Sequence, residues 1–294
     1  MPKIISCSNF ASKALSAVKS GTIHSVYNKT INILCGDNLL SLQSRGTPRS
    51  PLTLETNCIP QELWNMNIAP GIDAEISAQG IRVKGIFFDF DFDFASVWNA
   101  NLTEMLPDNS APERPISIDF LCSCLRELMP VGGFADLALP DGSLWKSSLS
   151  AQAASHILSR CHELLLSRNW DYAALKAADL LGLGEGLTPS GDDFLCGMLA
   201  ATDMLGTKDA QLARASLVRE LRPRLSKTND ISAAFLDCAI NGYFSNAVIS
   251  LACGGNAQSV TNDFSKIGHS SGADTLSGII FLIGSLSILG SAED

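Results

Sequence analysis

Two copies of one short motif carry the strongest chemical signal in the chain. The first copy reads GLGEGLTPSGDDFLCG over residues 182–197, and the second reads GHSSGADTLSG over residues 268–278. When Ser190 is aligned with Ser271, five of eight positions are identical, and an apolar run follows each copy. The repeat predicts two equivalent helix starts that lie far apart in the sequence.

A serine followed three residues later by an acidic residue is typical of a helix N-terminus. Each serine is expected to accept a hydrogen bond from a first-turn amide, while Asp193 or Asp274 accepts one from the serine amide. Gly191 and Gly272 would leave the first turn bare, so that a ligand could come close to backbone N–H groups. Two converging helix starts would form a site for a small anion. The alternative is that the motifs only cap two tightly packed helices.

The motifs also bring groups that could move a proton. His269 is the histidine beside a motif and could act as acid, base or carbonyl donor, or it could simply bond to the backbone of the capping region. Asp193 and Asp274 complete the candidate catalytic set. Asp192 has no capping role in this scheme and is the candidate contact for a substrate amide or for a metal such as Mg²⁺.

A basic residue between the two motifs extends the predicted anion site. Lys227 could offset phosphate charge, and Thr228 beside it is otherwise a simple N-cap. The candidate anion-binding residues are Gly184, Gly186, Thr188, Ser190, Gly191, Asp192, Lys227, Thr228, Ser270, Ser271 and Gly272.

The secondary structure that must position these groups is expected to change from strands to helices near residue 107. Before it, the apolar segments 31–34 and 39–42 flank a Gly-Asp-Asn turn signal, which predicts a hairpin, and further turns follow. The first twenty residues predict a short helix. We therefore expect a small β-rich N-terminal domain over residues 1–107.

After the linker-like residues 107–112, apolar residues recur with the helical period. Ile118, Leu121 and Leu125 form one such stripe, and the segment 154–165 forms another. Later helices are predicted over residues 193–205, 209–225, 230–241, 245–252, 256–266 and 274–289. The predicted fold class is α+β, with a larger, mainly helical domain over residues 115–294 that carries both motifs.

Composition argues against several classes of protein. The 294 residues carry a net charge of −9, so a general binder of nucleic acid or of anionic membranes is not expected, although one pocket can still bind a small anion. The nine cysteines are scattered without a C-x-x-C pair, which is typical of a reduced intracellular protein. No apolar signal segment opens the chain, and the apolar stretch 276–289 predicts a buried core helix, so a cytoplasmic location is expected. The sequence contains neither a P-loop nor a G-x-S-x-G elbow.

The two motifs, together with residues 228–232 and 239–244 between them, resemble the signatures of the AllH family. AllH is a subunit of the oxamate carbamoyltransferase of anaerobic allantoin breakdown, a part of purine degradation. The resemblance implies transfer of a carbamoyl group between phosphate and the amide nitrogen of oxamate, which gives oxalurate in one direction. It also implies two partner subunits, AllF, which is similar to FdrA, and AllG.

Three functions remain open on the sequence alone. The chain could be a catalytic carbamoyltransferase subunit, or a non-catalytic scaffold whose motifs cap helices at a subunit interface. It could also be a stand-alone phosphate- or nucleotide-binding enzyme of other chemistry.

Overall fold

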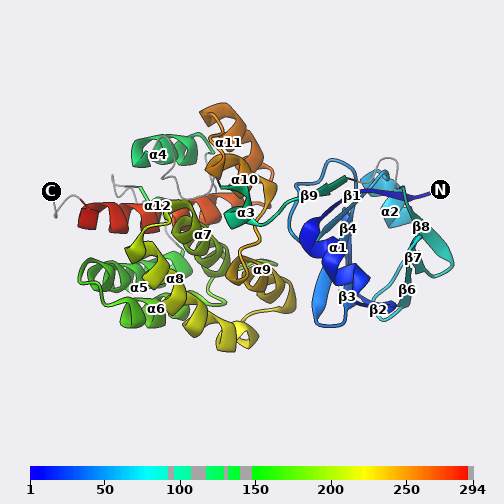
Figure 1. Cartoon of the computed structure of the whole chain (residues 1–294), viewed down its shortest axis with the longest axis horizontal. Coiled ribbons are helices and arrows are strands. Elements are labelled where there is room, and N and C mark those ends of the chain that lie inside the picture. The colour runs from blue at the N-terminus through cyan, green and yellow to red at the C-terminus, as the bar shows by residue number, and fades with distance from the viewer. Residues whose placement is uncertain (92–95, 107–116, 129–131, 140–147, 291–294) are drawn as a thin grey trace. The chain divides into compact units, whose positions relative to one another are not determined.

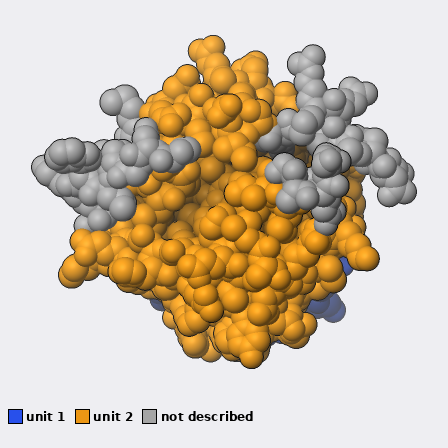
Figure 2. Space-filling model, turned by 90° about the vertical axis from the view of Figure 1, so that its left-hand side faces the viewer, with its two compact units in different colours: residues 1–101, 243–246 blue, residues 102–242, 247–294 orange. Residues whose placement is uncertain are grey.

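The computed structural model describes residues 1–91, 96–106, 117–128, 132–139 and 148–290 (Figure 1). The chain divides into two compact units. The first comprises Met1–Asn101 together with Tyr243–Asn246, and the second comprises Leu102–Gly242 together with Ala247–Asp294. Figure 2 colours the second unit orange and the first blue. The linker-like residues 107–112 lie outside the described residues.

The first unit is a closed, mixed β-barrel of eight strands. Its hydrogen-bonded order is β5-β4-β3-β2-β6-β7-β8-β1, and β1 pairs with β5 to close the ring. A ninth strand, β9, runs parallel to the end of β1. The strands are β1 Lys3–Ser8, β2 Ser20–Tyr27, β3 Thr30–Cys35, β4 Asn38–Gln43, β5 Thr53–Thr56, β6 Asp73–Ser77, β7 Gly80–Val83, β8 Ile86–Phe90 and β9 Ser96–Trp98. Two short helices, α1 Asn9–Ser16 and α2 Pro60–Asn65, belong to the same unit.

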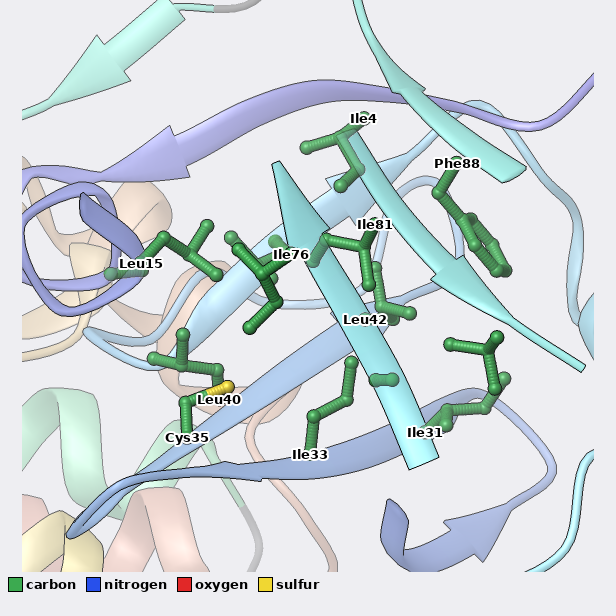
Figure 3. Packing of buried hydrophobic residues seen from close by; sticks show 14 of the residues in the cluster. Ile4, Leu15, Ile31, Ile33, Cys35, Leu40, Leu42, Ile76, Ile81 and Phe88 are labelled. Atoms are coloured by element: carbon green, nitrogen blue, oxygen red, sulfur yellow. The ribbon is translucent and has the colours of Figure 1, made fainter. Parts of the chain in front are cut away.

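The hairpin expected from residues 31–42 is confirmed and supplies much of the barrel core. β3 and β4 pair antiparallel, with Cys35 opposite Asn38 at the turn. Side chains on one face of a strand alternate with those on the other, so Ile31 and Ile33 both point inward and are fully buried. Figure 3 shows Leu42 and Ile81 in the same core, which they fill from other strands.

The expected helix at the start of the chain is only half correct. Residues 3–8 form β1, and the helix α1 begins at Asn9, with the Ser8 hydroxyl accepting from the Ala11 amide at 2.9 Å. β1 pairs with β5, β8 and β9. These partners come from distant parts of the sequence, so tertiary pairing, not local pattern, makes this segment a strand.

A short segment from the helical part of the sequence completes the first unit. The Phe244 amide donates to the Ala100 carbonyl at 2.8 Å, and the Asn246 amide donates to the Arg49 carbonyl at 3.0 Å. The Tyr243 ring packs edge-on against Phe10, with 5.2 Å between ring centroids. The two compact units are therefore not two uninterrupted stretches of sequence.

The second unit is mainly helical, as predicted, so the fold class is α+β. Its helices are α3 Leu102–Met105, α4 Ile118–Glu127, α5 Leu149–Leu166, α6 Trp170–Ala177, α7 Ser190–Leu205, α8 Lys208–Leu221, α9 Asp230–Ile240, α10 Asn246–Ala252, α11 Ala257–Ser265 and α12 Ser271–Gly290, with short 3₁₀ turns η1 Ala135–Leu137, η2 Ala178–Leu180 and η3 Arg222–Lys227. The six later helices predicted from the sequence all form, and most of their ends agree within three residues.

The most apolar helix, α12, lies in the core of this unit. It is long and apolar enough to cross a membrane by composition, with a mean hydropathy of 1.7, but two thirds of that window is buried inside the protein. Residues such as Leu276, Ile279 and Leu282 have no exposed surface. The prediction of a buried core helix is therefore confirmed.

Candidate functional site

The two motifs meet in space, because α7 and α12 pack side by side (Figure 1). A methyl group placed on Gly197 would lie 2.0 Å from the Thr275 carbonyl oxygen, and one placed on Gly278 would lie 2.0 Å from the Phe194 carbonyl oxygen. Each contact is the other moved by the 81-residue repeat, so the pair has an approximate two-fold symmetry. A bond of 2.8 Å between the hydroxyls of Thr188 and Ser271 joins the two N-termini at one end.

Gly191 and Gly272 lie against the backbone of the segments that precede α7 and α12, and are not open to a ligand. A methyl group on Gly191 would lie 2.1 Å from the Leu180 carbonyl oxygen, and one on Gly272 would lie 2.0 Å from the Phe264 carbonyl oxygen. Their amides are also occupied. The Gly191 amide donates to the Leu183 carbonyl at 2.8 Å, and the Gly272 amide donates to the Ile267 carbonyl at 3.1 Å. The first turns are therefore closed by the chain at these two positions.

The capping boxes expected in both motifs are wrong. α7 begins at Ser190 itself, and its N-cap is Pro189, which makes no side-chain capping bond. In α12, Oδ1 of Asp274 accepts from the Phe134 amide at 2.6 Å, and that residue is 140 positions away in the sequence. Both aspartates are thus available for contacts between elements.

The aspartates and hydroxyls instead cross between the motifs. The hydroxyls of Ser271 and Thr188 interact with Asp193, and those of Ser190 and Ser270 interact with Asp274. Asp274 has no exposed surface, while Asp193 is only half-buried. Each aspartate nevertheless has a buried Oδ2 atom with no hydrogen-bond partner.

Burial makes both carboxyl groups weak acids. It raises the pKa of Asp274 to about 6, against the opposing effect of the Phe134 amide and the two serine hydroxyls. Burial raises the pKa of Asp193 well above its usual range, and the negative charge of Asp274 raises it further. Carboxyl groups of this kind can hold and transfer a proton near neutral pH.

Asp192 has a structural role. It is almost completely buried, and its Oδ1 accepts from the Gly182 amide at 2.8 Å. Its Oδ2 accepts a short bond from the Thr228 hydroxyl. Both oxygens are thus occupied by donors of the chain, and they tie the glycine-rich loop to the segment before α9. Nowhere among the described residues do three His, Cys, Asp or Glu side chains form a group that could hold a metal.

Replacing Thr228 by valine tests this tie. Thr228→Val keeps the side-chain volume but removes the hydroxyl that donates to the Asp192 carboxylate. We expect the free energy of unfolding to fall by about 1.5–3 kcal/mol, because the hydrogen bond involves a buried charge. Urea unfolding would measure the loss. Thr261→Val in α11 is the control, because the Thr261 hydroxyl donates to the exposed Glu127 carboxylate and not to a buried one, so an equal loss there would contradict the expectation.

The remaining predicted residues form the rim of this region, and most of them are exposed. In the loop before α7, a methyl group on Gly186 would meet open space, whereas one on the half-buried Gly184 would lie 2.6 Å from the Ser190 amide nitrogen. Lys227 is exposed at the end of η3, and its carbonyl oxygen packs against Gly182 in the same loop. His269 is exposed in the turn that precedes α12. The rim therefore carries a histidine two residues before α12 and a lysine whose backbone lies against the loop before α7.

One part of the site was not predicted from the sequence. Gly133 and Phe134, which precede η1, lie against the Asp274 carboxylate, and a methyl group on Gly133 would come within 2.3 Å of its Oδ1. The available signal was the Gly132-Gly133 pair, which marks a tight backbone turn. Nothing in the local sequence says which distant side chain such a turn contacts.

Comparison with protein-family models identifies both parts of the chain. Residues 180–283 match the model described as oxamate carbamoyltransferase subunit AllH, and residues 3–97 match the AllH family N-terminal domain. The first match includes both motifs, and the second corresponds to the barrel. No solved structure matches the chain. The chain therefore belongs to the AllH family, whose namesake is a subunit of oxamate carbamoyltransferase.

Proposed function

We propose that this chain is a catalytic subunit of an oxamate carbamoyltransferase, and that the joined N-termini of α7 and α12 handle the proton of the reaction. One observation carries the proposal. The two aspartates of the repeated motif lie near enough for the charge of Asp274 to raise the pKa of Asp193, and each has a buried, unpartnered oxygen and a raised pKa. Asp192, by contrast, is paired on both of its oxygens. The buried Asp203 also has an unpartnered Oδ2, but it forms an ion pair with Arg214, whereas no basic side chain of the described residues acts on either motif aspartate.

The chemistry of carbamoyl transfer needs such a group. The amide nitrogen of oxamate is a poor nucleophile until its proton is removed, and the proton must return when the reaction runs from oxalurate and phosphate. A carboxyl group with a pKa of about 6, as Asp274 has, is a stronger base than an ordinary aspartate. Asp193, which is half-buried, would connect the pair to the substrate.

The rim supplies the groups for the anionic substrates. Lys227 would lie near the phosphate, His269 would donate to the carbamoyl carbonyl, and Gly184 and Gly186 would allow backbone amides to approach. Gly191 and Gly272 are not part of this anion site, because their amides are used inside the chain. We place the reaction in the cytoplasm, in a complex with AllF-like and AllG-like subunits in allantoin catabolism.

Turnover by the assembled complex tests the proposal. The chain would be combined with the two partner subunits, and formation of carbamoyl phosphate from oxalurate and phosphate would be measured. We expect Asp193→Asn and Asp274→Asn each to lower turnover by about 10²–10⁴-fold, because neither amide can accept a proton. Asp119→Asn, also in the first turn of a helix but exposed, is the matched control. Wild-type turnover in both motif variants would refute the proposal.

A scaffold function is the second candidate, and the burial of Asp274 favours it. A carboxyl group with no exposed surface can hold two elements together without contacting a substrate. In that case the Asp274→Asn variant would fail to assemble with its partners on gel filtration. Any complex that did form would have normal turnover per assembled particle. Normal assembly with lost turnover would favour the catalytic function instead.

A further inference from the structure

The two-fold symmetry of the motifs is broken at their aspartates. Asp193 and Asp274 occupy equivalent places in the repeat, and both interact with hydroxyls from the neighbouring segments. Asp274 additionally accepts a hydrogen bond from the backbone amide of Phe134, at 2.6 Å. Among the described residues, no backbone amide donates a hydrogen bond to the Asp193 carboxyl group in this way. A backbone N–H donor stabilises the ionised form of a carboxyl group, so the two aspartates differ in the form that their surroundings favour.

Gly133 is what allows this amide to reach the carboxylate. A methyl group at this position would lie 2.3 Å from Oδ1 and 2.8 Å from Oδ2 of Asp274, which is shorter than any ordinary contact. The residue also has a φ angle of +72°. Only glycine combines this conformation with so close an approach. The unpartnered Oδ2 of Asp274 lies against the same glycine, so the segment both binds and encloses the carboxylate.

We infer that Gly133 and the Phe134 amide are positioning groups that hold the Asp274 carboxylate ionised and thereby favour the protonated form of Asp193. With Asp274 ionised, a neutral Asp193 avoids placing a second negative charge beside it. Asp193 then presents an O–H donor at the half-buried end of the pair, where a substrate anion would otherwise meet two carboxylates. The meaning of this arrangement for turnover rests on the proposed function, whereas the location of the proton does not.

The other ionisable groups near the two aspartates do not oppose an ionised Asp274 and a protonated Asp193. Asp192 adds negative charge near Asp193 and so works in the same direction. Cys196, one turn further along α7, is itself a much weaker acid than a free thiol, because it is buried beside Asp193 and Asp192. Asp192 therefore favours a neutral Asp193, and the neutral thiol of Cys196 adds no charge to the pair.

The experiment reads the protonation of the isolated chain directly. Aspartate labelled with ¹³C at the carboxyl carbon would be followed by NMR from pH 4 to pH 9, with Asp193→Asn and Asp274→Asn used to assign the two signals. We expect the Asp274 signal to titrate first and the Asp193 signal to remain that of the acid at pH 7. In Gly133→Ala the Asp274 midpoint should rise by about one pH unit or more, because the amide donor is displaced.

Gly132→Ala is the matched control. Gly132 also has a positive φ angle, +84°, but a methyl group on it would meet nothing within 4 Å. Both alanine variants therefore carry similar backbone strain, and only one displaces Asp274. If Gly133→Ala does not fold, an ester in place of the Phe134 amide removes the donor without adding an atom, and it should raise the same midpoint.

Two results would overturn the inference. One is a wild-type chain in which both aspartates are ionised at pH 7. The other is an unchanged Asp274 midpoint in the ester variant. Neither result depends on turnover. If instead the NMR shifts occur while the pH profile of turnover in the assembled complex stays the same, the inference about the proton stands and the catalytic proposal fails.

Discussion

Gly278→Ala should destabilise the second unit severely, although it adds a single methyl group. That methyl group would lie 2.0 Å from the Phe194 carbonyl oxygen and 2.9 Å from its carbonyl carbon, which are backbone atoms of α7. A backbone atom cannot rotate away as a flexible side chain can, so the two helices must separate. We expect the free energy of unfolding to fall by about 3 kcal/mol or more, measured by urea unfolding. Gly197→Ala should have a similar effect, because it makes the symmetric contact with Thr275.

Gly284→Ala is the control on the same helix. Its added methyl group would lie 3.8 Å from Ile118 Cδ1, an ordinary van der Waals contact. Alanine is a better helix former than glycine by up to about 1 kcal/mol, so this variant should be neutral or slightly more stable. Equal losses at Gly278 and Gly284 would show that helical propensity, and not the close approach of α7 and α12, decides the outcome.

The repeat in the sequence predicted correctly that the two helix starts meet, but not what lies against the glycines of their first turns. Five identities in eight positions indicated two equivalent helix starts, and the structure joins Thr188 to Ser271 at 2.8 Å. Gly191 and Gly272 were expected to leave space for a ligand. The carbonyl groups of Leu180 and Phe264 occupy that space instead. A glycine is required by either kind of close approach, and the sequence does not say what approaches it.

The parts that the sequence did not predict depend on partners far along the chain. The helices and the hairpin were predictable because each has its own local period of apolar residues. β1 is a strand because β5, β8 and β9 pair with it. Asp274 is bound by an amide 140 residues away, so its expected capping role was wrong although the helix start was nearly right. The motifs predicted which residues belong to the candidate site, whereas the distant contacts determine which groups those residues bind.

Another buried aspartate of α7 offers a test of electrostatics away from the motifs. Asp203, near the end of α7, forms an ion pair of 3.0 Å with Arg214 of α8, and its side chain is only 4% exposed. The Arg214 guanidinium also donates to the carbonyl groups of Ala239 and Ile240 at 3.3 Å each, at the end of α9. The pair thus connects three helices of the second unit.

Arg214→Met should lower the free energy of unfolding by about 3–5 kcal/mol at pH 7.5, because it leaves the buried Asp203 carboxylate without its counterion. Arg160→Met is the control, since its ion pair with Glu163 is exposed on both sides and should be worth no more than about 1 kcal/mol. The double variant Arg214→Met/Asp203→Leu should recover much of the loss, because no charge then remains buried.

The pH dependence of the Arg214→Met loss separates an electrostatic cause from lost packing. Burial raises the pKa of Asp203 to about 6, so the folded protein holds this proton more tightly than the unfolded chain does. The stability that comes from this binding is fully present below about pH 4 and is lost as the pH rises through about 6. Without Arg214 the pKa of Asp203 rises further, because the arginine charge lowers it in the native protein. The loss in Arg214→Met should therefore be small near pH 4 and grow toward pH 7.5, as urea unfolding at several pH values would show. A loss of the same size at every pH would mean that the methylenes and hydrogen bonds of Arg214, and not its charge, hold the three helices together.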